Sequence, residues 1–235
     1  KIASQQLSLQ GNFVTGKIKH QLFTGVDFEN SFAEAYTFTF TPATYGSGNI
    51  FDFQNFNQGT GIPDAALDRI VKTTTNRFGI YAQDLISLTE KIKVLAGIRW
   101  SWQESQPITT DIKNSKIIDG VKQKDVAFSP KIGLIFQPTK QTSVFASYSD
   151  SFTPNTGTTV DGKVLDPSII KQYEVGVKND FWKGLFSANV TLYQITNDNL
   201  AQTAEFKVDG SINTDPLKKV LSGETKSKGI EIDLT

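Results

Sequence analysis

The feature that most constrains this chain is a set of long stretches in which apolar residues alternate with polar ones. In residues 92–102 and 126–136, every second residue belongs to one apolar set, and the residues between are mostly small, polar or charged. Strict alternation places the two sets on opposite faces of a β-strand. Lys93, Arg99 and Lys131 all belong to the second set, and the apolar set contains no charged residue. The pattern predicts an all-β fold whose strands keep one face free of charge.

Strand candidates of this kind cover most of the chain. They lie at about 3–14, 17–40, 73–88, 92–105, 123–137, 142–152, 169–181, 185–196 and 225–234, with a shorter one near 202–208 or 217–222. A typical globular strand has about 5–6 residues, and most of these candidates are longer. A strand of about 11 residues at ~3.3 Å each, tilted by about 40°, rises roughly 28 Å, which is close to the apolar thickness of a bilayer.

The connections between the candidates alternate between short and long. The short ones are "TGK" at 15–17, "TEK" at 89–91, "PTKQ" at 138–141 and "WKG" at 182–184, and the long ones are 41–72, 106–122, 153–168 and 197–224. Outer-membrane barrels have this layout, with short periplasmic turns and longer external loops. We therefore predict an antiparallel up-and-down transmembrane β-barrel segment of about 9–10 strands.

The apolar faces provide candidate lipid-facing residues, because a Lys or Arg that faces lipid at the midplane of a barrel costs ~2–4 kcal/mol. These candidates are Val94, Ala96, Ile98, Trp100, Ile132, Leu134, Val144, Ala146, Val175 and Val177. One residue departs from the pattern, since Asp84 falls on the face of Ile80, Ala82 and Ile86. We expect Asp84 to lie near the membrane interface or in a bulge that turns its side chain away.

The stretch "VFASYSDSFTPN" (Val144–Asn155) indicates what lies beyond the other face. Ser147, Ser149 and Ser151 line one side of this strand, whereas a soluble surface usually carries Lys and Glu and a packed core carries Leu and Val. Serine suits the wall of a wet or filled lumen, because small polar groups leave room and meet water. Phe145 is the exception on this face, and we expect it to pack on whatever plugs the lumen or on neighbouring lumen side chains.

A soluble β-sandwich also alternates apolar and polar residues along its strands, and it is an alternative at this point. The chain would then be a binding module whose apolar faces pack together in a closed core. The long strands and the alternating connection lengths count against this alternative.

Composition removes several classes of function. Lys plus Arg equal Asp plus Glu at 24 each, with no basic run, which argues against nucleic acid as a partner. The chain has no Cys, so it has neither disulfides nor thiolate metal sites. No cluster has the spacing of zinc ligands, and we expect no metal site.

The sequence also offers no catalytic constellation. "GNFVTGK" (Gly11–Lys17) matches most of a phosphate-binding loop, but Ile18 stands where the magnesium ligand belongs, and the segment predicts strand, turn, strand. His20, the one histidine, lies on the apolar face, and nothing in the sequence brings a Ser and an Asp to it. We expect no enzymatic activity and no cofactor.

Several segments together resemble a known family. "FSPKIGLIFQPTKQTSVFASYSDSFTPN" (Phe128–Asn155), "QYEVGVKNDFWKGLFSANVTLYQITNDN" (Gln172–Asn199) and "SKGIEIDLT" (Ser227–Thr235) look like the barrel of TonB-dependent siderophore receptors. "HQLFTGVDF" (His20–Phe28) and "RFGIYAQDLISLTEKIKVLAGIRW" (Arg77–Trp100) resemble its earlier strands in the same order. The likeness is greatest to the ferrichrome-type, hydroxamate branch, and it weakens in 41–72 and 106–122.

The resemblance implies more than these residues show. Family members have an N-terminal plug domain before a barrel of about 22 strands, and we expect 1–235 to be part of a single barrel domain with the plug absent. It implies active transport of a ferric siderophore, as ligand rather than cofactor, across the bacterial outer membrane. Outer-membrane lipid and, through the plug, the TonB complex are the implied partners. A passive porin-like or adhesin-like barrel is the alternative within the same fold.

Ligand contacts are expected on loops and on the upper lumen wall. The candidates are Tyr45, Phe51, Phe53 and Phe56 in the longest loop, and Arg99, Ser101 and Gln103 on the inward face near the outside. The aromatic rings offer flat apolar contact, and Arg99 offers charge to an anionic ligand. Loop packing and solvation of the lumen are the competing explanation for each of them.

Overall fold

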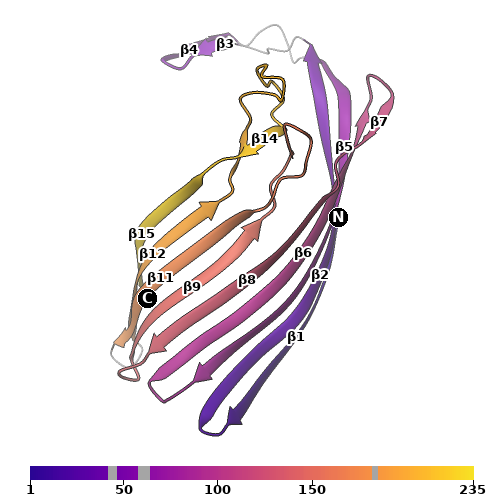
Figure 1. Cartoon of the computed structure of the whole chain (residues 1–235). Coiled ribbons are helices and arrows are strands. Elements are labelled where there is room, and N and C mark those ends of the chain that lie inside the picture. The colour runs from indigo at the N-terminus through magenta and orange to yellow at the C-terminus, as the bar shows by residue number, and fades with distance from the viewer. Residues whose placement is uncertain (42–46, 58–63, 182–184) are drawn as a thin grey trace.

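One long, curved antiparallel sheet dominates the structure (Figure 1). The computed structural model describes residues 1–41, 47–57, 64–181 and 185–235, and of residues 47–48 and 53–57 it describes the backbone alone. Nine strands succeed one another across the sheet: β1 (Ile2–Thr15), β2 (Ile18–Thr41), β5 (Asp64–Ser87), β6 (Ile92–Asp111), β8 (Gln123–Phe136), β9 (Thr142–Thr153), β11 (Ser168–Phe181), β12 (Phe186–Asp198) and β15 (Glu224–Leu234). The described residues contain no helix long and apolar enough to cross a membrane.

The remaining strands are short and lie in the long connections. They are β3 (Ser47–Asn49), β4 (Asp52–Asn57), β7 (Lys116–Asp119), β10 (Thr158–Thr159), β13 (Ala201–Thr203) and β14 (Lys218–Leu221). β7 pairs with the end of β6 and is the tenth strand of the main sheet, β3 pairs with β4, and β10, β14 and β13 form a small sheet of their own. The predicted all-β, up-and-down segment of about 9–10 strands is thus confirmed.

Each long strand pairs with the long strands next to it in sequence, so the sheet is a meander. Short turns lie at one end and long connections at the other, as Figure 1 shows. Two of the short turns share one device: the hydroxyls of Thr89 and Thr139 each accept hydrogen bonds from two backbone amides, at 3.0–3.2 Å. Such Thr turns close the chain without long connections. The predicted turn at 182–184 lies outside the described residues.

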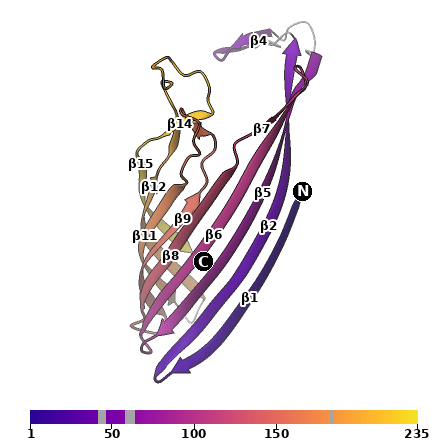
Figure 2. The same ribbon diagram turned by 45° about the vertical axis from the view of Figure 1, so that its right-hand side comes forward.

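The strands curve into an open trough (Figure 2). Among the described residues only Leu165 and Ala204 are buried apolar side chains, and both lie in the long connections. A β-sandwich needs two sheets whose apolar faces bury one another. The single wall with its exposed apolar face therefore rules out the sandwich alternative.

Apolar and polar faces separate as the alternation predicts. All ten candidate lipid-facing residues lie on the outward face, where Val175 is opposite Ala146 and Val177 is opposite Val144. Ile132 is 58% exposed, Ile98 51% and Val175 47%. An apolar band with this exposure fits a lipid surface, and contact with lipid stays a prediction.

Asp84 does lie on the apolar face, and it has a partner there. The register of β5 is continuous through Asp84, so the bulge considered from the sequence is absent. His20 on β2 approaches Asp84 with 2.6 Å between Nδ1 and Oδ2, and the ring of Phe13 on β1 stacks on the imidazole with 4.5 Å between centroids. The second oxygen, Oδ1, is buried and has no partner among the described residues. Two sequence irregularities, the lone histidine and the misplaced aspartate, thus form one pair.

Two boundaries differ from the sequence prediction. β5 begins at Asp64 rather than near 73, and β6 continues to Asp111 rather than ending near 105. The upper part of β2 pairs with the early part of β5, up to Thr41 opposite Asp64. A long strand needs a partner for its backbone amides and carbonyls along its whole length. Residues 64–72, predicted as part of a loop, provide that partner for the upper part of β2.

Aromatic rings on the inward face lie against glycines of the next strand. An added Cβ at Gly176 would be 2.6 Å from the ring of Phe145, and one at Gly25 would be 2.5 Å from the hydroxyl of Tyr81. Phe145, the aromatic exception on the serine-lined face, therefore packs flat on the wall rather than projecting into the lumen. Glycine is required here by close approach and not by an unusual φ.

We expect Gly176→Val to destabilise the wall by about 1–3 kcal/mol, because the new side chain displaces the Phe145 ring. The matched control is Gly133→Val on the central strand β8, since an added Cβ there meets other atoms only at 3.4 Å or more, which is ordinary van der Waals contact. Urea-induced unfolding in lipid vesicles measures both. Equal unfolding midpoints for the two variants would contradict the packing assigned to Phe145.

Candidate functional site

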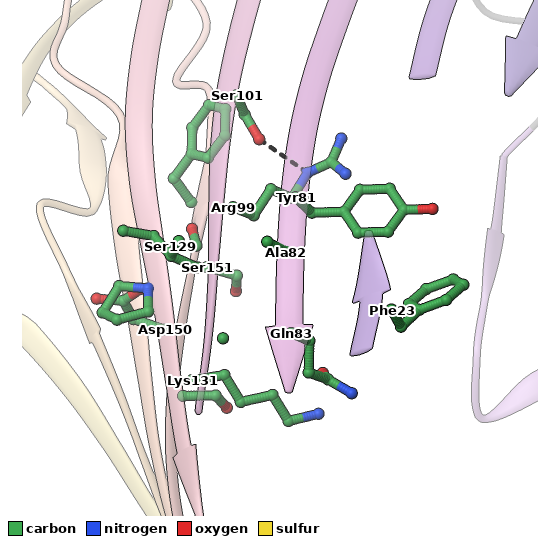
Figure 3. Close-up of a pocket in the computed structure, with 15 residues that line it drawn as sticks. Phe23, Tyr81, Ala82, Gln83, Arg99, Ser101, Ser129, Lys131, Asp150 and Ser151 are labelled. Carbon is green, nitrogen blue, oxygen red and sulfur yellow. Dashed lines mark hydrogen bonds between the residues drawn. The ribbon is translucent and has the colours of Figure 1, made fainter. Parts of the chain in front are cut away.

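The inward face has a concavity of about 410 Å³ midway along the wall. Its lining comes from five neighbouring strands, β2, β5, β6, β8 and β9. Figure 3 shows Tyr81, Arg99 and Ser101 on one side of it and Ser129, Lys131 and Ser151 on the other. Alternation brings them together, because residues two apart on each strand project toward the same face.

Arg99 is the most strongly held group of this concavity. Its guanidinium donates two hydrogen bonds to Asp27, from Nη1 and Nη2 at 2.8 Å each, and Nε donates to Ser101 Oγ at 2.9 Å. Its charge also lies over the Tyr81 ring, 5.7 Å from the centroid. Bidentate Arg–carboxylate pairing fixes both position and orientation.

A glycine makes this pairing possible. Asp27 on β2 is opposite Gly79 on β5, and Gly79 is opposite Ser101 on β6. The Arg99 side chain crosses the strand between it and Asp27 directly above Gly79, where any Cβ would collide with the guanidinium. Asp27 and Arg99 therefore meet across β5 at Gly79, the position where this intervening strand has no side chain.

A second pair continues the network toward the long connections. Arg77 Nη1 donates to Glu29, and Arg77 Nε donates to Gln103 Oε1 at 2.8 Å. Together Asp27, Glu29, Arg77 and Arg99 carry no net charge. The upper wall is therefore polar and rigid but electrically balanced, which suits recognition by hydrogen bonds and ring contact more than by bulk charge.

The structure brings three of the seven predicted contact residues together. Arg99, Ser101 and Gln103 follow one another along the inward face of β6 and belong to these two networks. Phe51 is 89% exposed in the connection between β3 and β4, which lies at the far end of the long connections in Figure 1. Tyr45 lies outside the described residues, and so do the side chains of Phe53 and Phe56.

Sequence reasoning missed Tyr81 and Asp125 as members of the inward surface. Tyr81 accepts a hydrogen bond from Gln6 on β1 at 3.0 Å, and its inward position was readable from the alternation of β5. Asp125 lies near the start of β8 and is 3% exposed. It accepts a hydrogen bond from Gln123 Nε2 at 3.1 Å. No sequence signal marks its burial.

Two of the long connections are joined above the wall. Asn155 Nδ2 donates to the carbonyls of Asp166 and Asn199, at 2.7 and 3.0 Å, and Ser168 Oγ donates to Asn199 O at 2.9 Å. Asn199 has φ 58°, in the left-handed region that Asn tolerates better than most residues. The connections 154–167 and 199–223 therefore form one layer, which also contains the small β10–β14–β13 sheet.

The inward face offers hydroxyls, amides, paired charges and aromatic rings. The described residues contain no group of three or more His, Cys, Asp or Glu that could hold a metal ion. The single described histidine is on the outward face, paired to Asp84. What remains is a polar concave wall beneath a joined loop layer.

Comparison with known proteins gives a consistent result. A family model described as TonB dependent receptor-like, beta-barrel, matches residues 2–235. The metal-pseudopaline receptor CntO of Pseudomonas aeruginosa (strain UCBPP-PA14) is 28% identical over 231 residues, covering 98% of this chain and 31% of the relative. The ferrichrome outer membrane transporter/phage receptor of Escherichia coli (strain K12) is 28% identical, covering 98% of this chain and 29% of the relative.

Solved structures share the fold. The siderophore receptor PiuA from Acinetobacter baumannii matches with a TM-score of 0.76 at 20% identity, over 99% of this chain and 35% of that structure. The ferripyoverdine receptor of the outer membrane of Pseudomonas aeruginosa, solved with ferripyoverdine, matches with a TM-score of 0.75 at 21% identity, over 99% of this chain and 30% of that structure. The chain spans about a third of the length of the relatives and structures that it matches.

Proposed function

Because the chain belongs to the TonB-dependent receptor β-barrel family, we propose that its parent protein imports a ferric siderophore across the outer membrane. Membership of this family places the chain in the bacterial outer membrane as part of a receptor, not an enzyme. The observation that supports the proposal most is the two-faced wall, with an apolar outward face and an inward face of paired charges and hydroxyls. Import of a large polar chelate needs such a lumen inside such a lipid-facing shell.

We assign residues 1–235 to a single barrel domain and the plug to another part of the parent chain. β1 and β15 have no outer neighbour among the described strands, and open sheet edges do not persist in a bilayer. Further strands of the parent, up to about 22 in plugged barrels of this class, complete the wall. TonB acts through the plug in this proposal.

The ligand is contacted from the loop layer and the upper lumen. Phe51 and the loop aromatics Tyr45, Phe53 and Phe56 offer ring surfaces, whereas Ser101 and Gln103 offer hydrogen-bonding groups beside Arg99. Asp27 already neutralises Arg99, so this site favours a ligand that can exchange hydrogen bonds with the pair over one that brings negative charge alone. The siderophore is the transported ligand in this proposal and has no cofactor role.

The test is uptake of ⁵⁵Fe by cells whose only siderophore receptor is the parent protein. Ferrichrome, ferrioxamine B and ferric pyoverdine are the first ligands to compare, because they are named for relatives. We expect saturable uptake of at least one ligand, and loss of that uptake when TonB is deleted.

The two alternatives predict different results in the same cells. A passive porin-like barrel gives non-saturable entry that survives deletion of TonB. An adhesin-like barrel gives no ligand-dependent uptake. Either outcome across a wide ligand panel contradicts the proposal.

A further inference from the structure

We propose that three lysines on the turn-side half of the inward face dock an acidic segment of the parent's plug. Lys93, Lys131 and Lys178, here called the lower basic patch, come from β6, β8 and β11 and line one concavity of about 420 Å³. Lys131 lies at its upper border, because it also lines the concavity midway along the wall. This inference rests on the proposed function, because it requires that the lumen holds a plug. It adds the chemistry by which one region of the plug is held.

The fold places the three lysines on a common surface. Lys93 is opposite Ile135 on β8, and Ile135 is opposite Phe145 on β9. The ammonium of Lys178 lies 5.5 Å from the centroid of the Phe145 ring. The patch therefore has an apolar floor with ammonium groups around it.

These lysines differ from the arginines above them in having no anionic partner. Arg77 and Arg99 are neutralised within the wall by Glu29 and Asp27. By contrast, no ion pair of Lys93, Lys131 or Lys178 is found in the part of the chain that the structure describes.

The carboxylate of Glu174 lines the same concavity, and each of its two oxygens already accepts a hydrogen bond from the wall. Glu174 accepts from Gln172 Nε2 at 2.6 Å through one oxygen and from Ser147 Oγ at 3.2 Å through the other. Counting the three lysines and Glu174, the concavity has two positive charges in excess. The wall itself does not supply the balancing groups.

When the plug fills the lumen, the two excess positive charges lose water, which is unfavourable unless the plug segment beside them is acidic. Removing an ammonium from water without a partner is strongly unfavourable, and like charges in one concavity repel each other. A plug segment with two or more Asp or Glu side chains satisfies the patch by charge complementarity. The remaining two thirds of the relatives' length, outside the match, leave ample chain for such a segment.

Charge reversal in the full-length receptor tests the assignment. The variant carries Lys93→Glu, Lys131→Glu and Lys178→Glu, and the matched control carries Lys17→Glu, Lys91→Glu and Lys140→Glu. The control makes the same change of charge on three lysines of the short turns, outside the concavity. Both are expressed in cells without TonB and without added siderophore, so transport does not enter the readout.

Two measurements report whether the plug is held. Hydrogen exchange of plug amides should rise about tenfold or more in the patch variant, because losing charge-assisted hydrogen bonds lowers the free energy of local opening, and about 1.4 kcal/mol corresponds to tenfold. Passive entry of vancomycin should rise in the same variant. The control should match the wild type in both.

A variant that fails to assemble is replaced by the neutral set Lys93→Gln, Lys131→Gln and Lys178→Gln, which removes attraction without adding repulsion. Wild-type plug exchange and vancomycin entry in an assembled variant overturn the proposal. If uptake of an anionic ferric chelate then falls while the plug is unaffected, the patch is part of the ligand path instead. Because exchange and leakage need neither TonB nor a siderophore, a receptor that imports nothing can still confirm or overturn the docking.

Discussion

We expect Val175→Arg to prevent most of the parent receptor from assembling in the outer membrane. Val175 lies on the outward face of β11, between Ala146 of β9 and Leu192 of β12, and is 47% exposed. A guanidinium at this depth faces hydrocarbon, which costs ~2–4 kcal/mol in a barrel. That cost is a large fraction of the stability of an ordinary domain, about 5–15 kcal/mol.

The measurement is the folded fraction in outer-membrane fractions, read from heat-modifiable electrophoretic mobility. Gln172→Arg is the matched control, because it adds the same side chain to the inward face of the same strand. The control should assemble at close to the wild-type level. Wild-type assembly of Val175→Arg would show that the outward face does not meet lipid.

We expect His20→Ala to destabilise the barrel by about 1–3 kcal/mol, because it leaves the Asp84 carboxyl group without its hydrogen-bond partner on a face that is poor in water. The His20 and Asp84 side chains are 14% and 20% exposed, and they lie on the face assigned to lipid. Removing the imidazole leaves Asp84 without its partner and removes the ring on which Phe13 stacks.

A double variant distinguishes the loss of one partner of the His20–Asp84 pair from the effect of changing the side chains at these two positions. His20→Leu with Asp84→Leu removes both polar groups and should restore stability to near the wild-type level, because replacing both partners of a buried hydrogen bond by apolar groups can be nearly neutral. Urea titration of refolding into lipid vesicles measures all three proteins. An effect below about 0.5 kcal/mol for His20→Ala, the scale of ordinary surface substitutions, would contradict the role given to the pair.

The two faces of the wall were predictable because the face of each residue follows from alternation with a period of two, even where the exact ends of a strand are uncertain. β8, β9 and β11 begin and end within a residue or so of their predicted limits, and their faces follow from counting alone. The start of β5 was not predictable in that way, because residues 64–72 mix Asp, Arg, Lys and Ala without clean alternation. Its signal was indirect: the predicted strand 17–40 needed a partner of equal length.

The inward site was only half predictable for a different reason. Arg99, Ser101 and Gln103 share one strand, so their common face follows from sequence. The Asp27–Arg99 pair depends on the register of three strands and on the missing side chain at Gly79. Likewise, the alternation of β8 does not determine that Asp125 is only 3% exposed. Periodicity carries no information about either.

The meander also bears on how receptors of this kind diversify. Each long strand pairs only with the strands next to it in the sequence, and two consecutive strands with their short turn form a self-contained hairpin. Such a hairpin exchanges hydrogen bonds with one neighbour on each side, and so a duplicated or deleted hairpin leaves every other pairing intact. Barrel circumference can therefore change two strands at a time, but a pair such as Asp27–Arg99 is kept only where all three of its strands are kept.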